Sequence, residues 1–178
     1  MSGVPMPLSS RVAVPDGGKL AGMRITVVSV GHRMPAWIQS GWGEYAKRLP
    51  PEMKLELTEL KPEERTSGKT VDKAKALEGE RILAALPAGA TVYALDEKGR
   101  AITTQGLSVM LAGWMRDGTH PAFVIGGADG LSEEVKARAD KLLSLSAMTL
   151  PHGLARVLLA EQLYRAWSIL ANHPYHRE

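Results

Sequence analysis

The chain has 178 residues, of which 44% are apolar and 23% charged, a composition typical of a globular protein. It contains no cysteine, which excludes disulfide bonds, thiolate metal sites and a cysteine nucleophile. Its formal net charge of +3 is compatible with a polyanionic partner such as a nucleic acid, although a solvated surface explains so small an excess equally well.

The first 22 residues differ from the rest of the chain. Residues 1–22 are rich in Pro, Gly, Ser and Val and lack the apolar core of a signal peptide, so we expect a disordered leader. Met23 then opens a strand-like run and is the expected functional start. Residues 23–178 have the size of one domain. No window approaches the roughly 20 apolar residues of a membrane span.

After the leader, strand-like and helix-like segments alternate. Residues 24–30 (RITVVSV) form a β-branched run, which predicts a strand. Pro35 stands where the first turn of a helix accepts proline, and apolar residues then recur at helical spacing. Residues 54–60 (KLELTEL) predict a second strand. The polar stretch 61–69 predicts a loop before a helix that Thr70 caps.

The alternation continues to the end of the chain. Further strands are predicted at residues 90–95, 121–125 and 145–150. Further helices are predicted to start at Thr103 or Thr104, at Ser132 and at Leu154. The helix after Ser132 carries Glu133 and Glu134 in its first turn, which matches the helix dipole.

This alternation, with buried strands that lack a strict period of two, predicts an α/β fold. We expect a mainly parallel sheet with helices on both faces. In such folds ligands bind outside the carboxyl ends of the strands. Three places meet that condition: Leu95–Asp96, the glycine-rich segment 126–130 (GGADG) and residues 147–152.

The glycine-rich segment 126–130 has two interpretations. Glycine lets the backbone turn sharply and approach a ligand closely, which favours a nucleotide or nucleoside site. A plain turn between strand and helix is the alternative. The spacing is not GxGxxG, and no acidic residue is placed to bind a ribose.

Two residues near the start of the last helix are candidates for chemistry. His152 follows Pro151, although a lone histidine is more often structural. Arg156 shares a helix face with Leu159 and Leu163. A charge on an apolar face is costly unless paired, so Arg156 is expected at an interface, facing an anion or beside an internal carboxylate. We favour the functional and interface settings over the buried pair.

The C-terminal tail is rich in chemically active side chains. His173, Tyr175, His176 and Arg177 suit base stacking, phosphate binding or proton transfer. A metal site is less well supported, because no acidic or second histidine cluster joins these residues in the sequence.

Three other groups are better explained by structure than by chemistry. They are the surface ion pair Glu161–Arg165, the aromatic residues Trp37, Trp42 and Tyr45, which we expect in the core, and the basic loop residues Lys61, Arg65 and Lys69, for which a phosphate contact is the weaker interpretation.

Taken together, several motifs resemble the ribosomal RNA large subunit methyltransferase H family. These motifs are GxxMPxW at residues 31–37, GGxxG at 126–130, LSxxTLPH at 145–152, RV at 156–157, ExxYRA at 161–166 and YHR at 175–177. The resemblance covers residues 23–178, and the combination is specific where each motif alone is not. The leader has no counterpart in the family, and Gly153 stands where a bulkier residue is common.

The resemblance implies an S-adenosyl-L-methionine-dependent methyltransferase of the SPOUT class. It also implies a C-terminal trefoil knot, which the rarity of knots would otherwise argue against. Such enzymes are cytoplasmic homodimers that need no metal and no membrane. They methylate N3 of a pseudouridine in helix 69 of 23S rRNA, within the assembled ribosome.

Carried over by position, the resemblance implies two groups of site residues. The cofactor-binding positions are Leu95, Gly126, Leu145, Ser146, Ala147, Met148, Thr149 and Leu150. The catalytic positions are His152, Arg156, Tyr175 and His176. The resemblance also allows the tail to complete the active site of the partner subunit. His152, His176 or a water molecule would accept the N3 proton, and the sequence does not choose among them.

Two readings from other classes remain. One is a different nucleotide-binding α/β enzyme such as a dehydrogenase, which would bind NAD rather than S-adenosyl-L-methionine. The missing GxGxxG pattern argues against it. The other is a non-catalytic factor of the same fold, which would bind ribosomes tightly without transferring a methyl group.

Overall fold

The computed structural model describes residues 22–177, so the predicted leader lies outside the described residues except for Gly22. Its centre is a five-stranded sheet in which every neighbouring pair of strands is parallel. The strands, in the spatial order β2-β1-β4-β3-β5, are β1 (Met23–Val30), β2 (Met53–Leu60), β3 (Thr91–Ala101), β4 (Pro121–Ile125) and β5 (Lys141–Ser144).

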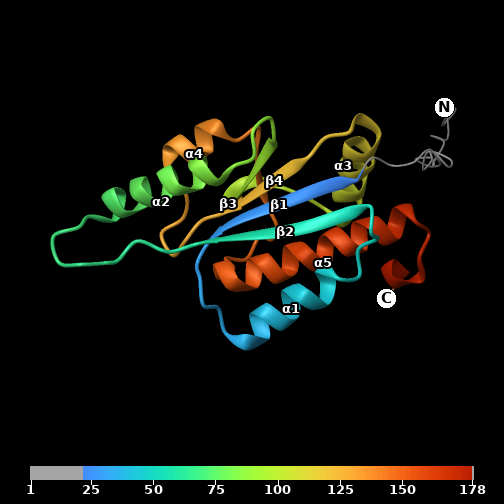
Figure 1. Cartoon of the computed structure of the whole chain (residues 1–178), viewed down its shortest axis with the longest axis horizontal. Coiled ribbons are helices and arrows are strands. Elements are labelled where there is room, and N and C mark those ends of the chain that lie inside the picture. The colour runs from blue at the N-terminus through green and yellow to red at the C-terminus, as the bar shows by residue number, and fades with distance from the viewer. Residues whose placement is uncertain (1–21, 178) are drawn as a thin grey trace, which may run out of the picture.

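Helices cover both faces of this sheet (Figure 1). They are α1 (Ala36–Ala46), α2 (Val71–Ala85), α3 (Thr104–Asp117), α4 (Glu133–Arg138) and α5 (His152–Leu170), followed by the short 3-10 helix η1 (Pro174–Arg177). One face is covered by α3 and α5, with α1 packed on α5, and the other face by α2 and α4. The predicted α/β fold is confirmed, and the trefoil knot stays a prediction.

The sheet divides the interior into two cores. The core under α3 and α5 contains an aromatic group in which the Trp114 indole N–H donates to the Tyr93 hydroxyl at 2.9 Å, with Phe123 packed against both. The core under α2 and α4 is aliphatic and includes Val28 and Ile82. Because both faces are covered, β1 and β4 are almost wholly buried, which explains their continuous apolar sequences.

Three predicted helix starts are confirmed by side-chain caps, whereas the last helix begins at His152, two residues before the predicted Leu154, with no side-chain cap. Thr70 Oγ1 accepts the backbone N–H of Lys73 at 3.2 Å, and Thr103 Oγ1 accepts that of Gly106 at 3.0 Å. Ser132 accepts an N–H of α4 in the same way at 3.4 Å. These caps satisfy donors that the first turn of a helix leaves unpaired, which makes them readable from sequence.

Two predicted strand boundaries were wrong. β3 continues to Ala101 instead of ending at Leu95, because Leu95 and Arg100 both pair with Leu143 of β5 and the residues between them bulge out. β5 is correspondingly earlier than predicted, and residues 145–150 form a turn rather than a strand. Both errors depend on pairing between segments about 45 residues apart, which local pattern does not reveal.

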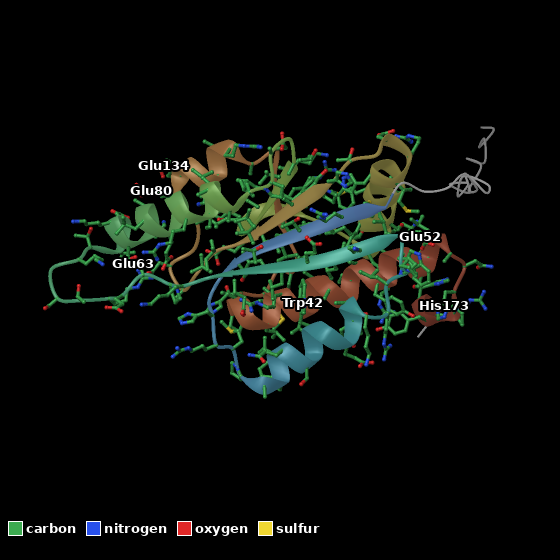
Figure 2. All side chains as sticks on the ribbon, viewed as in Figure 1. Trp42, Glu52, Glu63, Glu80, Glu134 and His173 are labelled. Carbon is green, nitrogen blue, oxygen red and sulfur yellow. The ribbon has the colours of Figure 1, made fainter. Side chains whose placement is uncertain are left out.

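The aromatic residues expected in the core are divided. Trp42 and Tyr45 are half-buried and pack against the core under α5, and Figure 2 labels Trp42 on this side of the molecule. Trp37 is instead 60% exposed, so its placement in the core was wrong. Among the described residues, no helix has the length and apolar character needed to cross a membrane.

Candidate active site

A cavity of about 430 Å³ lies at the carboxyl ends of β4 and β5, beside the bulge at residues 95–98 of β3. It is lined by these parts of the strands, the glycine-rich segment 126–130, the turn 145–150 and the first residues of α5. The predicted cofactor positions that line it are Leu95, Gly126, Leu145, Ser146, Met148, Thr149 and Leu150. Ala147 belongs to the same turn but does not line the cavity. The sequence thus located the cavity, and the cofactor role of these residues stays a prediction.

The turn 145–150 is shaped by its own serines and tied to β3. Ser144 Oγ donates to the carbonyl of Ser146 at 2.8 Å, and Ser146 Oγ accepts the N–H of Met148 at 2.9 Å. Thr149 Oγ1 donates to the Glu97 carboxylate at 3.3 Å, in the part of β3 that bulges out. The bulge that the sequence did not predict therefore anchors one wall of the cavity.

The opposite wall is the glycine-rich segment 126–130. Gly130 has φ +80°, and its N–H donates to the Gly127 carbonyl at 3.1 Å, which closes a tight turn. A Cβ on Gly126 would lie 2.8 Å from the backbone of Gly130. Glycine is therefore required for the turn itself at these positions, and the turn leaves backbone exposed to the cavity.

Charged residues that sequence reasoning missed also line the cavity. Asp96 follows Leu95, and its carboxylate pairs with Lys136 of α4 at 3.3 Å. Asp129 lies in the glycine-rich turn and pairs with Arg65. Their position directly after two predicted strands was the signal available, because carboxyl ends of parallel strands meet at one edge of the sheet.

His152 is the predicted catalytic residue that reaches the cavity. It is the first residue of α5 and lines the cavity beside the turn 145–150. Burial, and secondly the charge of Arg156, lower the pKa of its imidazole. The neutral form, which accepts protons, is therefore favoured near neutral pH. Gly31, with φ +128°, makes room for the ring, because a Cβ there would lie 3.0 Å from it.

Arg156 is fully buried one turn further along α5, with 1% of its surface exposed. Its guanidinium donates to Glu59 Oε1 at 2.6 Å, to Ser29 Oγ at 2.9 Å and to the Gly31 carbonyl at 3.1 Å. Among the three environments that the sequence leaves open for Arg156, the structure shows the internal carboxylate, which the sequence favours least. Arg156 ties the ends of β1 and β2 to α5 beside His152.

The tail packs on its own chain. The Tyr175 hydroxyl donates to Glu161 Oε1 at 3.0 Å, and Glu161 also pairs with Arg165 at 2.9 Å, as predicted for that i,i+4 pair. The Tyr175 ring lies 4.7 Å from both the Tyr164 ring and the Arg165 guanidinium. Burial, and then the Glu161 hydrogen bond, raise the pKa of Tyr175, so its phenol stays protonated.

The cavity lies at the first turn of α5, whereas the tail follows the last turn and folds back to Glu161 in the middle of the helix. The helix has 19 residues, which corresponds to about 28 Å at 1.5 Å per residue. Its first residue, His152, lines the cavity, and η1 with Tyr175 and His176 follows its other end (Figure 1). Figure 2 labels His173 in the tail, at that far end. The fold therefore does not bring the four predicted catalytic residues together within one chain.

The basic loop between β2 and α2 is neutralised by acidic partners. Lys61 pairs with Glu64 at 3.3 Å, Lys69 pairs with Glu63, and Arg65 pairs with Asp129. These pairs favour a structural role for the loop over a phosphate contact. In the part of the chain that the structure describes, no group of three or more His, Cys, Asp or Glu side chains is arranged to hold a metal ion.

The chain matches known proteins over almost all of the described residues. The family described as "Predicted SPOUT methyltransferase" matches residues 23–176. A relative named "Ribosomal RNA large subunit methyltransferase H", from Burkholderia ambifaria, is 61% identical over 155 residues, which cover 87% of this chain and 99% of the relative. A protein of the same name from Burkholderia multivorans has the same identity and coverage.

A solved structure supports the fold independently. A probable methylase family protein from Haemophilus influenzae Rd KW20 superimposes with a TM-score of 0.50 at 16% identity, covering 87% of this chain and 70% of that one. At this identity the likeness concerns the fold alone. The chain belongs to the ribosomal RNA large subunit methyltransferase H family of SPOUT methyltransferases.

Proposed function

We propose that the chain transfers a methyl group from S-adenosyl-L-methionine to N3 of a pseudouridine in helix 69 of 23S rRNA, on the assembled ribosome in the cytoplasm. The observation that carries the proposal is the cavity formed by Leu95, Gly126 and the turn 145–150, with His152 beside it. The relatives that share 61% of their residues with the chain are named for methylation of large-subunit ribosomal RNA.

The cavity suits a nucleoside cofactor. Its volume of about 430 Å³ lies within the usual range of small-molecule sites. Apolar side chains such as Leu95, Ile125 and Leu150 offer packing surface for a purine ring, and the tight turn at Gly126 exposes backbone to the cavity. When bound, S-adenosyl-L-methionine supplies an electrophilic methyl group on a positively charged sulfur.

The chain's own contribution is positioning and proton transfer. N3 must lie in line with the methyl group, and this positioning is the larger part of catalysis. N3 must also lose its proton, and His152 is the candidate base because its imidazole lines the cavity and burial lowers its pKa. Arg156 serves as a positioning residue, because its guanidinium holds the Gly31 carbonyl and Glu59 beside the start of α5.

The tail acts on the partner subunit's cavity in this proposal. Tyr175 and His176 do not line their own chain's cavity, and the Tyr175 hydroxyl contacts Glu161, about 14 Å along α5 from His152 at 1.5 Å per residue, so a homodimer that places each tail at the other cavity would unite the site. In that arrangement Arg177 or His176 would contact the RNA, and His176 is the alternative base. The hydrogen bond from Tyr175 to Glu161 fixes the tail on α5, and this fixed position supports its contact with the partner subunit's cavity.

The direct test is transfer of tritiated methyl from S-adenosyl-L-methionine to ribosomes that lack this modification. We expect label in the large-subunit rRNA at the helix 69 pseudouridine, and much less with naked rRNA. Calorimetric binding of S-adenosyl-L-methionine would be measured in parallel. Binding without label would point to another RNA substrate, and absence of binding would contradict the proposal.

A further inference from the structure

A buried carboxylate lies directly behind the glycine-rich wall of the cavity. Glu78 of α2 is only 2% exposed. Its Oε2 atom lies 3.1 Å from the point that a Cβ on Gly127 would occupy, and Gly127 lines the cavity. Because Gly127 has no side chain, the Glu78 carboxylate packs closely against the backbone of a residue that lines the cavity.

The charge of Glu78 is only partly compensated. Its Oε1 accepts the N–H of Glu63 at 2.9 Å and lies 3.7 Å from Arg65 Nη2. Arg65 also pairs with Asp129, so one guanidinium is divided between two carboxylates. Oε2 has no hydrogen-bond partner among the described residues. Burial in a medium of low dielectric constant leaves the field of such a group poorly screened.

This field reaches the cavity. The pKa of His152 is lowered by burial and by Arg156, and the charge of Glu78 acts on it in the opposite direction. Asp129 adds a second negative charge on the same wall. Three lysines line the cavity: Lys136 is engaged by Asp96, Lys98 is exposed to solvent, which screens it, and Lys75 is half-buried on α2.

We infer that Glu78 makes the cavity discriminate between the positively charged methyl donor and its neutral product. The inference rests on the proposed function. In methyl transfer the carbon–sulfur bond breaks, its electron pair stays on sulfur, a carbon–nitrogen bond forms at N3, and the N3 proton passes to the base. S-adenosylhomocysteine therefore leaves with one positive charge less. A buried carboxylate beside the cavity therefore favours binding of the donor over binding of the product.

The test is the ratio of the dissociation constants of S-adenosylhomocysteine and S-adenosyl-L-methionine, measured by calorimetry without ribosomes. Glu78→Gln keeps the shape and the Oε1 acceptor but removes the charge. We expect it to weaken donor binding on the order of five- to tenfold and to leave product binding unchanged. The matched control is Glu80→Gln, on the same helix but exposed and labelled in Figure 2, where the ratio should not change.

A second variant protects the test against misfolding. Asp129→Asn removes a charge from the cavity lining and frees Arg65 to pair fully with Glu78, so the ratio should fall in the same direction. A ratio unaltered in both variants would overturn the inference. Wild-type protein that binds neither ligand would instead contradict the proposed function, so the two failures are distinguishable.

Discussion

The two ends of α5 are built in different ways. At its first turn, His152 borders a cavity at the carboxyl ends of β4 and β5, and Arg156 holds β1 and β2 against the helix from the interior. After its last turn the chain folds back, and Tyr175 packs on the helix surface through Glu161 and Arg165. The first end borders a cavity and is braced from the interior, whereas the second is a surface cluster. The cavity of about 370 Å³ near the second end is lined by Trp167 and Leu170 and not by Tyr175 or His176. The four predicted catalytic residues are therefore divided, with two beside the cavity and two in the tail.

The largest effect is expected at the cavity end. His152→Ala removes the candidate base and should lower the rate of methyl transfer about 10²- to 10³-fold, with donor affinity changed much less. Single-turnover transfer of tritiated methyl to unmodified ribosomes measures the rate. His173→Ala, an exposed histidine in the tail, is the control and should retain nearly full activity. Full activity in His152→Ala would assign the proton to water or to His176.

A second substitution tests the buried hydrogen bonds of Arg156, which support the first turns of α5. Arg156→Ala leaves Glu59, Ser29 and the Gly31 carbonyl without their donor, which should lower the free energy of unfolding by about 3 kcal/mol. Urea denaturation measures it. Arg116→Ala removes an exposed ion pair with Asp117 and should leave stability unchanged. An equally small effect for Arg156 would mean that its buried network does not support the fold.

A smaller change is expected at the tail end. Tyr175→Phe removes the hydrogen bond to Glu161 and should cost about 1 kcal/mol, because the ring contacts with Tyr164 remain. In a Glu161→Ala background the same substitution should cost much less, since the acceptor of the hydrogen bond is already absent. Additive losses in the two backgrounds would show that Tyr175 and Glu161 do not interact in solution.

The smallest expected effect is the change of stability and of the methyl-transfer rate with pH. Because burial and then Arg156 lower the folded-state pKa of His152 from its usual 6.5, the folded protein binds fewer protons there than the unfolded chain. The resulting stability is present above pH 6.5 and is lost as the pH falls toward the lowered pKa. The rate of transfer should decline over the same acidic window. A midpoint above 6.5 in a rate profile would contradict His152 as the base.

The sequence predicts the residues that line the cavity better than the long-range contacts that hold them in place. Capping residues such as Thr70 and the apolar run of β4 act locally, so their helix and strand were correctly placed. The partner of Arg156 could not be foreseen, because Glu59 lies 97 residues away in sequence. The extension of β3 to Ala101 depends in the same way on pairing with β5. Residue types that carry chemistry were visible, and the contact of Tyr175 with Glu161 was not.

The central claim is that the two ends of α5 act together only across a dimer. Co-expression of a His152→Ala chain and a Tyr175→Ala chain, each inactive as a homodimer, followed by isolation of the mixed dimer, tests it most directly. The claim predicts one intact site per mixed dimer, made from the second chain's cavity and the first chain's tail, and therefore about half of the wild-type transfer rate. A mixed dimer as inactive as its parents would show that cavity and tail must come from the same chain.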